Sequence, residues 1–215
     1  MALAEPGRAG SPLWALVGVG GDELTAYGVD LAAEGGGFVI GGGSRTGRST
    51  ALLTMARSLL ARGTSVVALC PRPSPLQELD GTPGVTRVFS GAPDADEVSV
   101  ALTSVVGPLA IVIDDAEALA RTPADDAVKE FLRASGPGWQ VAVVAAGQLE
   151  EMKSELRGTI VEARKAKAGL LLSPSSTLDG DLVSMRLPRN LVGRMPPGRG
   201  LLALHGETML VQVPL

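Results

Sequence analysis

A glycine-rich stretch carries the residues of this sequence that are best suited to chemistry. Its spacing is G-x-x-x-x-G-[K]-[ST], with arginine where lysine is usual. Glycines let main-chain N–H groups surround a phosphate chain, and a helix that follows directs its positive N-terminal end at the same anion. We therefore expect a nucleotide-phosphate site formed by Gly42, Gly43, Ser44, Arg45, Thr46, Gly47, Arg48, Ser49 and Thr50. The alternative is a flexible turn before a helix.

Arg48 departs from the usual pattern of such a loop. Lysine places one compact charge between the last two phosphates, whereas arginine is longer, planar and forked. Arg48 is therefore a candidate catalytic residue that can neutralise phosphate charge. Its guanidinium cannot occupy the position of the lysine ammonium group with the same geometry. Because misplacement of about 1 Å can cost about 100-fold in rate, we expect weak or absent hydrolysis.

An acidic pair, Asp114-Asp115, follows the apolar run Leu109–Ile113. This is a Walker B pattern, which predicts that Asp114 and the Ser49 hydroxyl hold Mg²⁺ and that Asp115 acts on the attacking water. Aspartate is one methylene shorter than the glutamate that many hydrolytic motors use. The alternative is that Asp115 caps a turn near residues 116–120.

Two further residues are candidates for the same chemistry. Gln148, after an apolar strand, lies where a γ-phosphate sensor is expected, or it begins an ordinary helix. Arg164, with Lys165 and Lys167, could act on the nucleotide of a neighbouring subunit, or be a solvated charge run. The same two interpretations apply to the basic residues Arg186, Arg189, Arg194 and Arg199. Cys70 and His205 are interpreted as structural.

Buried strands alternating with helices must position these residues. Apolar runs predict strands at Leu13–Val19, Glu23–Leu31, Phe38–Ile40, Ser65–Cys70, Leu109–Ile113 and Trp139–Ala146. Helices are expected from Arg48 toward Gly63, over Asp94–Val106, from Thr122 toward Gly136 and near Gln148–Arg157, and a hairpin over Gly200–Val213. The pattern predicts an α/β fold with a mostly parallel sheet, helices on both faces and a C-terminal β-hairpin.

Composition excludes several classes of protein. Only 3% of the 215 residues are aromatic, which disfavours a base-stacking single-strand binder, and a net charge of −4 disfavours a DNA-coating surface. One cysteine and one histidine allow neither an internal disulfide nor a His/Cys metal cluster. With no apolar run long enough to span a membrane, we expect a cytoplasmic location, or the cytoplasmic face of a membrane-anchored complex.

We expect a linker or disordered start at residues 1–12 and a single domain at 13–215. In its loop, its acidic pair and the stretches 17–31, 164–174 (RKAKAGLLLSP) and 197–202 (PGRGLL), this domain resembles FtsK/SpoIIIE-type ATPase domains. It is most similar to the degenerate C-terminal ATPase domain of EccC-like type VII secretion proteins. The resemblance implies a RecA-like P-loop NTPase fold, ATP or ADP with Mg²⁺ as ligands, and sister ATPase domains in tandem or in a hexameric ring.

The resemblance also has implications for the function of the domain. It implies a nucleotide-binding, weakly or non-hydrolysing module of a larger translocation or secretion motor. One alternative is an active ATP-hydrolysing motor domain of a DNA or protein translocase. Another is a docking module with a vestigial nucleotide site, which binds the C-terminal peptide of a secreted substrate. Direct DNA binding and membrane insertion by this segment are not expected.

Overall fold

One twisted sheet organises the molecule. The computed structural model describes residues 10–21, 24–136 and 140–214, and in this part of the chain ten strands pair in the order β2-β1-β10-β9-β8-β3-β7-β6-β4-β5. In chain order they are β1 (Trp14–Gly20), β2 (Thr25–Asp30), β3 (Gly37–Gly42), β4 (Ser65–Cys70), β5 (Val85–Ser90), β6 (Leu109–Ile113), β7 (Val141–Gln148), β8 (Gly169–Leu172), β9 (Arg199–Leu204) and β10 (Glu207–Gln212).

The sheet has a parallel part and an antiparallel part. Strands β8, β3, β7, β6, β4 and β5 are parallel neighbours. From β8 onward the sheet continues antiparallel through β9, β10, β1 and β2. The hairpin of β9 and β10 turns at His205-Gly206. The predicted α/β class, mostly parallel sheet and C-terminal hairpin are therefore confirmed.

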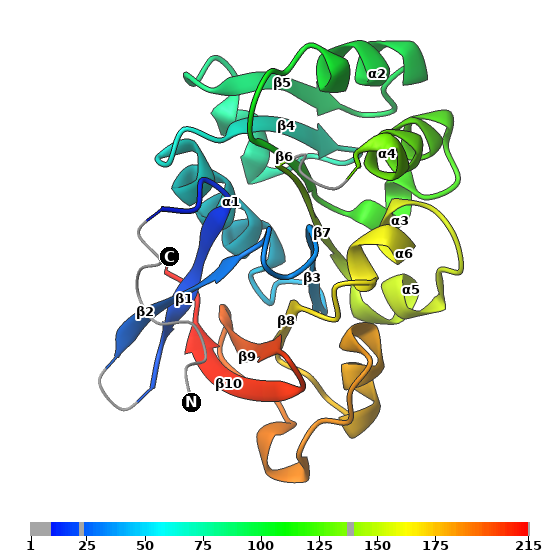
Figure 1. Ribbon diagram of the computed structural model, residues 1–215. Coiled ribbons are helices and arrows are strands. Elements are labelled where there is room, and N and C mark those ends of the chain that lie inside the picture. Colours follow the sequence, from blue (N-terminus) through cyan, green and yellow to red (C-terminus); the bar gives the residue numbers. More distant parts are fainter. Residues whose placement is uncertain (1–9, 22–23, 137–139, 215) are drawn as a thin grey trace.

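Helices cover both faces of the sheet (Figure 1). They are α1 (Arg48–Leu60), α2 (Ala95–Thr103), α3 (Ala116–Leu119), α4 (Pro123–Ala134), α5 (Leu149–Ser154) and α6 (Thr159–Arg164), with 3-10 turns η1 (Pro75–Leu79), η2 (Thr177–Val183) and η3 (Arg189–Leu191). One apolar cluster packs α1 and η1 against one face of the sheet. Residues of β1 belong to the same cluster and contact α1. A second apolar cluster packs the other face of the sheet against the turn η2 and the helices α2, α3, α4, α5 and α6.

The central strands are uninterrupted apolar runs because both of their faces are covered. Every residue of β6 is buried, and successive residues alternate between the two clusters: Ala110 belongs to the first and Ile111 to the second. The predicted strands Ser65–Cys70 and Leu109–Ile113 match β4 and β6 residue for residue.

Several predicted boundaries need correction. The helix expected over Asp94–Val106 is α2, which Asp94 caps but which ends at Thr103. The helix expected near Gln148–Arg157 is the shorter α5. Thr122 and Pro123 begin α4 as predicted. Elements β5, β8 and α6 had no prediction.

The predicted linker lies mostly outside the described residues, since 1–9 are not among them; the same holds for Glu23 and Trp139 at the ends of two predicted strands. None of the described helices combines the length and the apolar character needed to cross a bilayer.

Candidate functional site

The glycine-rich loop lies where β3 ends and α1 begins. The Thr46 hydroxyl donates to the carbonyl of Gly43 at 2.9 Å and so closes the loop on itself. A Cβ on Gly42 would lie 2.5 Å from that hydroxyl oxygen, so only glycine fits there. Arg45 and Gly47 both have positive φ, so the backbone enters the left-handed region twice within three residues. The loop is thus a tight turn that leads directly into a helix.

The N-terminus of α1 has no side-chain cap. Gly47 is the N-cap residue, and no acidic side chain lies in the first turn. The first bond of the helix runs from the Ala51 N–H to the Gly47 carbonyl, so the preceding amides have no partner within the helix. By contrast, Asp94 caps α2 and Thr122 caps α4. An anion is the partner that this uncapped end favours.

Arg48 reaches from the first turn of α1 to the acidic pair. Its Nη2 donates to Oδ1 of Asp115 at 3.3 Å, although the two residues are 67 positions apart. The two side chains are 12% and 19% exposed, so the ion pair is largely shielded from water. Nη1 of Arg48 is buried and, among the described residues, has no hydrogen-bond partner. A buried guanidinium nitrogen without a partner is costly, and an anionic ligand would satisfy it.

Asp114 ends β6 as a buried carboxylate. It is 2% exposed, and its Oδ2 accepts from the Ser74 hydroxyl at 2.7 Å. Its Oδ1 accepts from the main-chain N–H of Asp115. Ser74 was not among the residues predicted for the site, and it begins η1 with a capping box. Both oxygens of Asp114 are therefore held in fixed directions at the carboxyl edge of the sheet.

Asp115 has an unusual backbone conformation. Its φ of 47° places it in the left-handed region, and it precedes α3 without making a side-chain capping bond. The alternative in which its carboxylate caps the next turn is therefore wrong in this structure. The carboxylate instead faces Arg48.

Arg72 and Glu117 complete an ion-pair cluster that was not predicted. Nη1 of Arg72 lies 3.2 Å from Oε1 of Glu117 and 3.9 Å from Oδ1 of Asp115. Glu117 is 4% exposed at its side chain, and its Oε2 accepts the main-chain N–H of Gln148. Burial raises the pKa of the Glu117 carboxyl, as does the charge of Asp115, while the N–H groups of its own main chain and of Gln148 lower it. The only signal in the sequence was their position just after two apolar strands.

Gln148 lies beside the loop and is also the N-cap residue of α5, so the alternative that it begins a helix holds, and its role as a sensor stays a prediction. Its Nε2 donates to the Ser44 hydroxyl at 3.4 Å, and its main chain ends β7 next to β3. Ser49 lies in the first turn of α1, directly after Arg48. Thr50 follows in the same turn.

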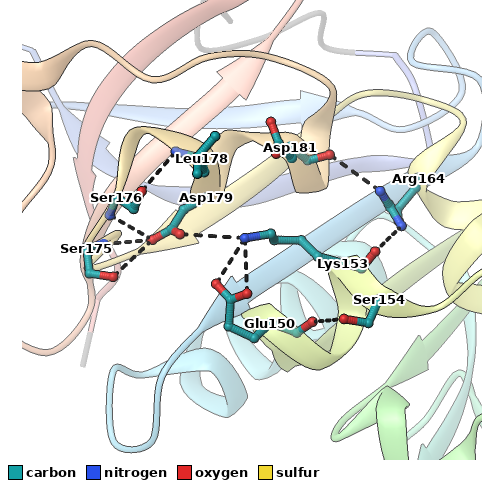
Figure 2. Close-up of polar contacts among 9 residues, drawn as sticks. All are labelled: Glu150, Lys153, Ser154, Arg164, Ser175, Ser176, Leu178, Asp179 and Asp181. Carbon is teal, nitrogen blue, oxygen red and sulfur yellow. Dashed lines mark hydrogen bonds and ion pairs between the residues drawn. The ribbon is translucent and has the colours of Figure 1, made fainter.

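Arg164 contacts its own chain. Its guanidinium donates to main-chain carbonyls of Lys153 and Glu155 beside α5 and of Asp181 and Leu182 in η2, at 3.2–3.4 Å. Figure 2 shows this side chain between the two segments. These contacts support a structural role, and the trans-acting role stays a prediction. Arg186, Arg189, Arg194 and Arg199 are exposed.

Two cavities flank the central strands at opposite ends. The one beside the loop has a volume of about 300 Å³, and its lining includes Gly43, Gln148, Leu172 and Asp179. A larger one of about 420 Å³ lies near Gly36 and Val141, at the amino ends of β3 and β7. The glycine-rich loop, the acidic pair and Gln148 all lie at the carboxyl ends of the strands, the edge at which open α/β sheets bind ligands, so this edge is the candidate site.

A late segment of the chain packs against the loop from outside. The N–H of Gly198 donates to the Thr46 carbonyl at 2.7 Å. The Gly198 carbonyl in turn accepts the N–H of Val213 at 2.8 Å, and Nε2 of Gln212 donates to Pro197. Gly198, which lies in the stretch 197–202 that carried part of the sequence resemblance, therefore contacts the glycine-rich loop directly.

No family model and no curated protein matches this sequence. Solved structures do. EssC (ATPases 2 and 3) from Geobacillus thermodenitrificans superposes with a TM-score of 0.75 at 18% identity, over 98% of this chain and 42% of that one. The cytoplasmic domain of the Thermomonospora curvata type VII secretion ATPase EccC superposes with a TM-score of 0.69 at 18% identity, over 97% of this chain and 27% of that chain.

Thermomonospora curvata EccC (ATPases 2 and 3) in complex with a signal sequence peptide gives a TM-score of 0.70 at 16% identity, over 97% of this chain and 41% of that chain. The present chain thus spans less than half the length of each of these three structures. It has the RecA-like P-loop NTPase fold of the EccC and EssC ATPase domains, as the sequence resemblance implied.

Proposed function

We propose that residues 13–215 form a nucleotide-binding, FtsK/SpoIIIE-like domain that hydrolyses ATP weakly or not at all. In this proposal it serves as a regulatory or structural module of a larger translocation or secretion motor. Its ligands are ATP or ADP with Mg²⁺, and its location is cytoplasmic. The fold shared with EccC and EssC supports the motor context.

One observation carries the nucleotide assignment: the uncapped N-terminus of α1 is next to Arg48, whose Nη1 has no hydrogen-bond partner in the part of the chain that the structure describes. Main-chain amides and a buried guanidinium are the donors that phosphate prefers. A purely structural loop would leave both sets of donors without an acceptor, at a cost in stability.

The acidic pair supports weak hydrolysis. Water activation requires a carboxylate free to accept a proton near the terminal phosphate. Asp115 is instead paired with Arg48 and lies near Arg72. Oδ1 of Asp115 faces both arginines, and the aspartate side chain is one methylene shorter than the glutamate that activates water in many hydrolytic motors.

The residues also fit Mg²⁺. Within the described residues no three His, Cys, Asp or Glu side chains gather as a metal cluster. Mg²⁺ in nucleotide sites needs fewer protein ligands, since phosphate oxygens and water supply the rest. Ser49 and Asp114 would hold it. When bound, the ion would neutralise phosphate charge and fix the phosphate chain.

Sister ATPase domains, in tandem or in a hexameric ring, are the proposed partners. The EssC and EccC structures named above contain more than one ATPase. One EccC structure is a complex with a signal sequence peptide, which supports the C-terminal peptide of a secreted substrate as a second partner. Direct DNA binding is not part of this proposal.

Calorimetry with Mg-ATP and Mg-ADP on the 215-residue chain tests the nucleotide assignment. We expect binding by the wild type and a loss of about 10- to 100-fold in affinity for Arg48→Ala, because a charge-assisted contact is removed. Arg57→Ala is the matched control, since this arginine lies on the same helix, 59% exposed and paired with Glu78. Undetectable binding at millimolar nucleotide would contradict the assignment, and rapid multiple turnover of ATP would contradict weak hydrolysis.

A further inference from the structure

The two terminal nitrogens of Arg48 have different surroundings. Nη2 contacts Oδ1 of Asp115, whereas Nη1 is buried without a partner in the described part of the chain. A guanidinium presents its donors as a planar fork, and carboxylate and phosphate oxygens are equivalent acceptors for it. One of the two positions that Arg48 offers to an anion is therefore already filled from within the protein.

A second arginine also contacts the Asp115 carboxylate. Nη1 of Arg72 lies 3.9 Å from the same Asp115 oxygen, and it is anchored at 3.2 Å on the buried Glu117. Glu117 is fixed in turn by the main-chain N–H of Gln148. Asp115 has a left-handed backbone and makes no side-chain capping bond to the helix that it precedes, and its carboxylate contacts these two cations.

Resting on the proposed function, we propose that Asp115 stands in for the terminal phosphate of a nucleoside triphosphate, so that the site selects a nucleoside diphosphate. Nη1 of Arg48 and the main-chain amides at the start of α1 donate hydrogen bonds to the last phosphate of the diphosphate. A third phosphate meets the Asp115 carboxylate, which is a like charge on the same guanidinium. Asp115 is then a specificity-determining residue for the length of the phosphate chain.

Charge supports this assignment. Arg48 and Arg72 pair with Asp115 and Glu117, and the buried carboxylate of Asp114 lies directly beside this group, so no cation of the cluster is left over for a further phosphate. Displacing Asp115 to admit a third phosphate would separate a largely buried carboxylate from both of its cations. Breaking such a pair on one side leaves an uncompensated charge, which is strongly unfavourable.

Calorimetry with ADP and with a β,γ-imido analogue of ATP, each with Mg²⁺, tests the inference on the whole chain. We expect the wild type to bind ADP about tenfold more tightly or better, and Asp115→Asn to shift the affinity ratio about tenfold toward the analogue. Asparagine tolerates the positive φ of this position. Asp115→Gly, which suits the same backbone, is the second variant. Asp126→Asn is the matched control, an exposed aspartate on α4, and should leave the ratio unchanged.

Equal affinities in the wild type, or a ratio that Asp115→Asn and Asp115→Gly leave unchanged, would overturn the inference while the proposed function stands. If the wild type binds neither nucleotide, the proposed function fails and the inference with it. Circular dichroism of each variant establishes that it is folded before its affinities are compared.

Discussion

Arg48 links the two halves of the candidate site. Its side chain starts in the first turn of α1 and ends at the acidic pair after β6. A lysine at this position would offer one ammonium group. The fork of arginine instead places Nη2 on Asp115, while Nη1 is buried and has no hydrogen-bond partner among the described residues. The arginine at this position thus forms an ion pair that joins the glycine-rich loop to the acidic pair.

Cys70 shows how buried the same edge of the sheet is. The residue ends β4, and burial raises the pKa of its thiol to about 11; the nearby charges of Asp114 and Asp115 act in the same direction, and a bond with Ser74 acts against them. The interpretation of Cys70 as a structural residue fits this environment, since a neutral buried thiol is a poor nucleophile.

We predict that Cys70 of the native chain reacts with Ellman's reagent at pH 8 far more slowly than in guanidinium chloride. The folded pKa is raised, so the thiol of the unfolded chain ionises first. The free energy of unfolding should therefore fall as the pH rises from about 9 to 11. Cys70→Ala should lack this component of the pH dependence. Equal reaction rates in the native and denatured chains would contradict the prediction.

Local spacing made part of the site predictable. The order of Gly42, Gly47 and Ser49 and the pair after β6 are patterns within a few residues, and the fold brings them to one edge. The contact of Arg48 with Asp115 spans 67 positions and depends on side-chain conformation. Arg72, Ser74 and Glu117 were missed for the same reason, because charged residues after a strand are common and only their mutual distances single them out.

At the scale of elements, η2 and α5 are joined through polar contacts (Figure 2). Asp179 is buried, and its Oδ2 accepts the N–H groups of Ser175 and Ser176 at 2.7 and 3.1 Å. Its Oδ1 lies 3.8 Å from Nζ of Lys153 on α5. Arg164 adds its bonds to carbonyls on both sides. These contacts fix one wall of the cavity beside the phosphate loop.

We predict that Arg164→Met lowers the free energy of unfolding by about 1–3 kcal/mol, because several carbonyls lose a charged donor at once. Urea denaturation followed by circular dichroism measures this change. Arg157→Met is the matched control, an exposed arginine just after α5, and should change stability by less than about 0.5 kcal/mol. Similar losses in both variants would show that Arg164 does not join the two segments.

Burial explains which elements were predictable. β4 and β6 are apolar throughout because neighbours cover both faces, and this makes their limits visible in the sequence. β5 is an edge strand that carries exposed Thr86 and Arg87, so it lacks that signal. β8 and α6 have four and six residues, too few for a periodic pattern.

At the scale of the whole molecule, the phosphate loop is held by residues from distant parts of the sequence. Gly198 bonds to Thr46, and Val213 bonds to Gly198. A Cβ on Gly47 would lie 3.0 Å from the nitrogen of Gly198. The close approach of these two glycines joins the beginning of α1 to the segment before β9.

We predict that Gly47→Ala is more damaging than Gly63→Ala. Both glycines have positive φ, so alanine costs about 1–2 kcal/mol at either position. Only Gly47 would also press on Gly198, since nothing lies within 4 Å of a Cβ on Gly63. Urea denaturation should show a greater loss for Gly47→Ala, and calorimetry should show weaker ADP binding for that variant alone. Equal losses would contradict the role of this contact.

The support of the loop by Gly198 has a consequence for biosynthesis. Residues 42–49 leave the ribosome long before residues 198–213, and the nascent chain therefore carries these amides without their outer support. The contact of Gly198 with the loop, and that of Val213 with Gly198, form only after these late residues have been made. Under the proposed function, we therefore expect the complete nucleotide site only in a polypeptide that has been translated through Val213.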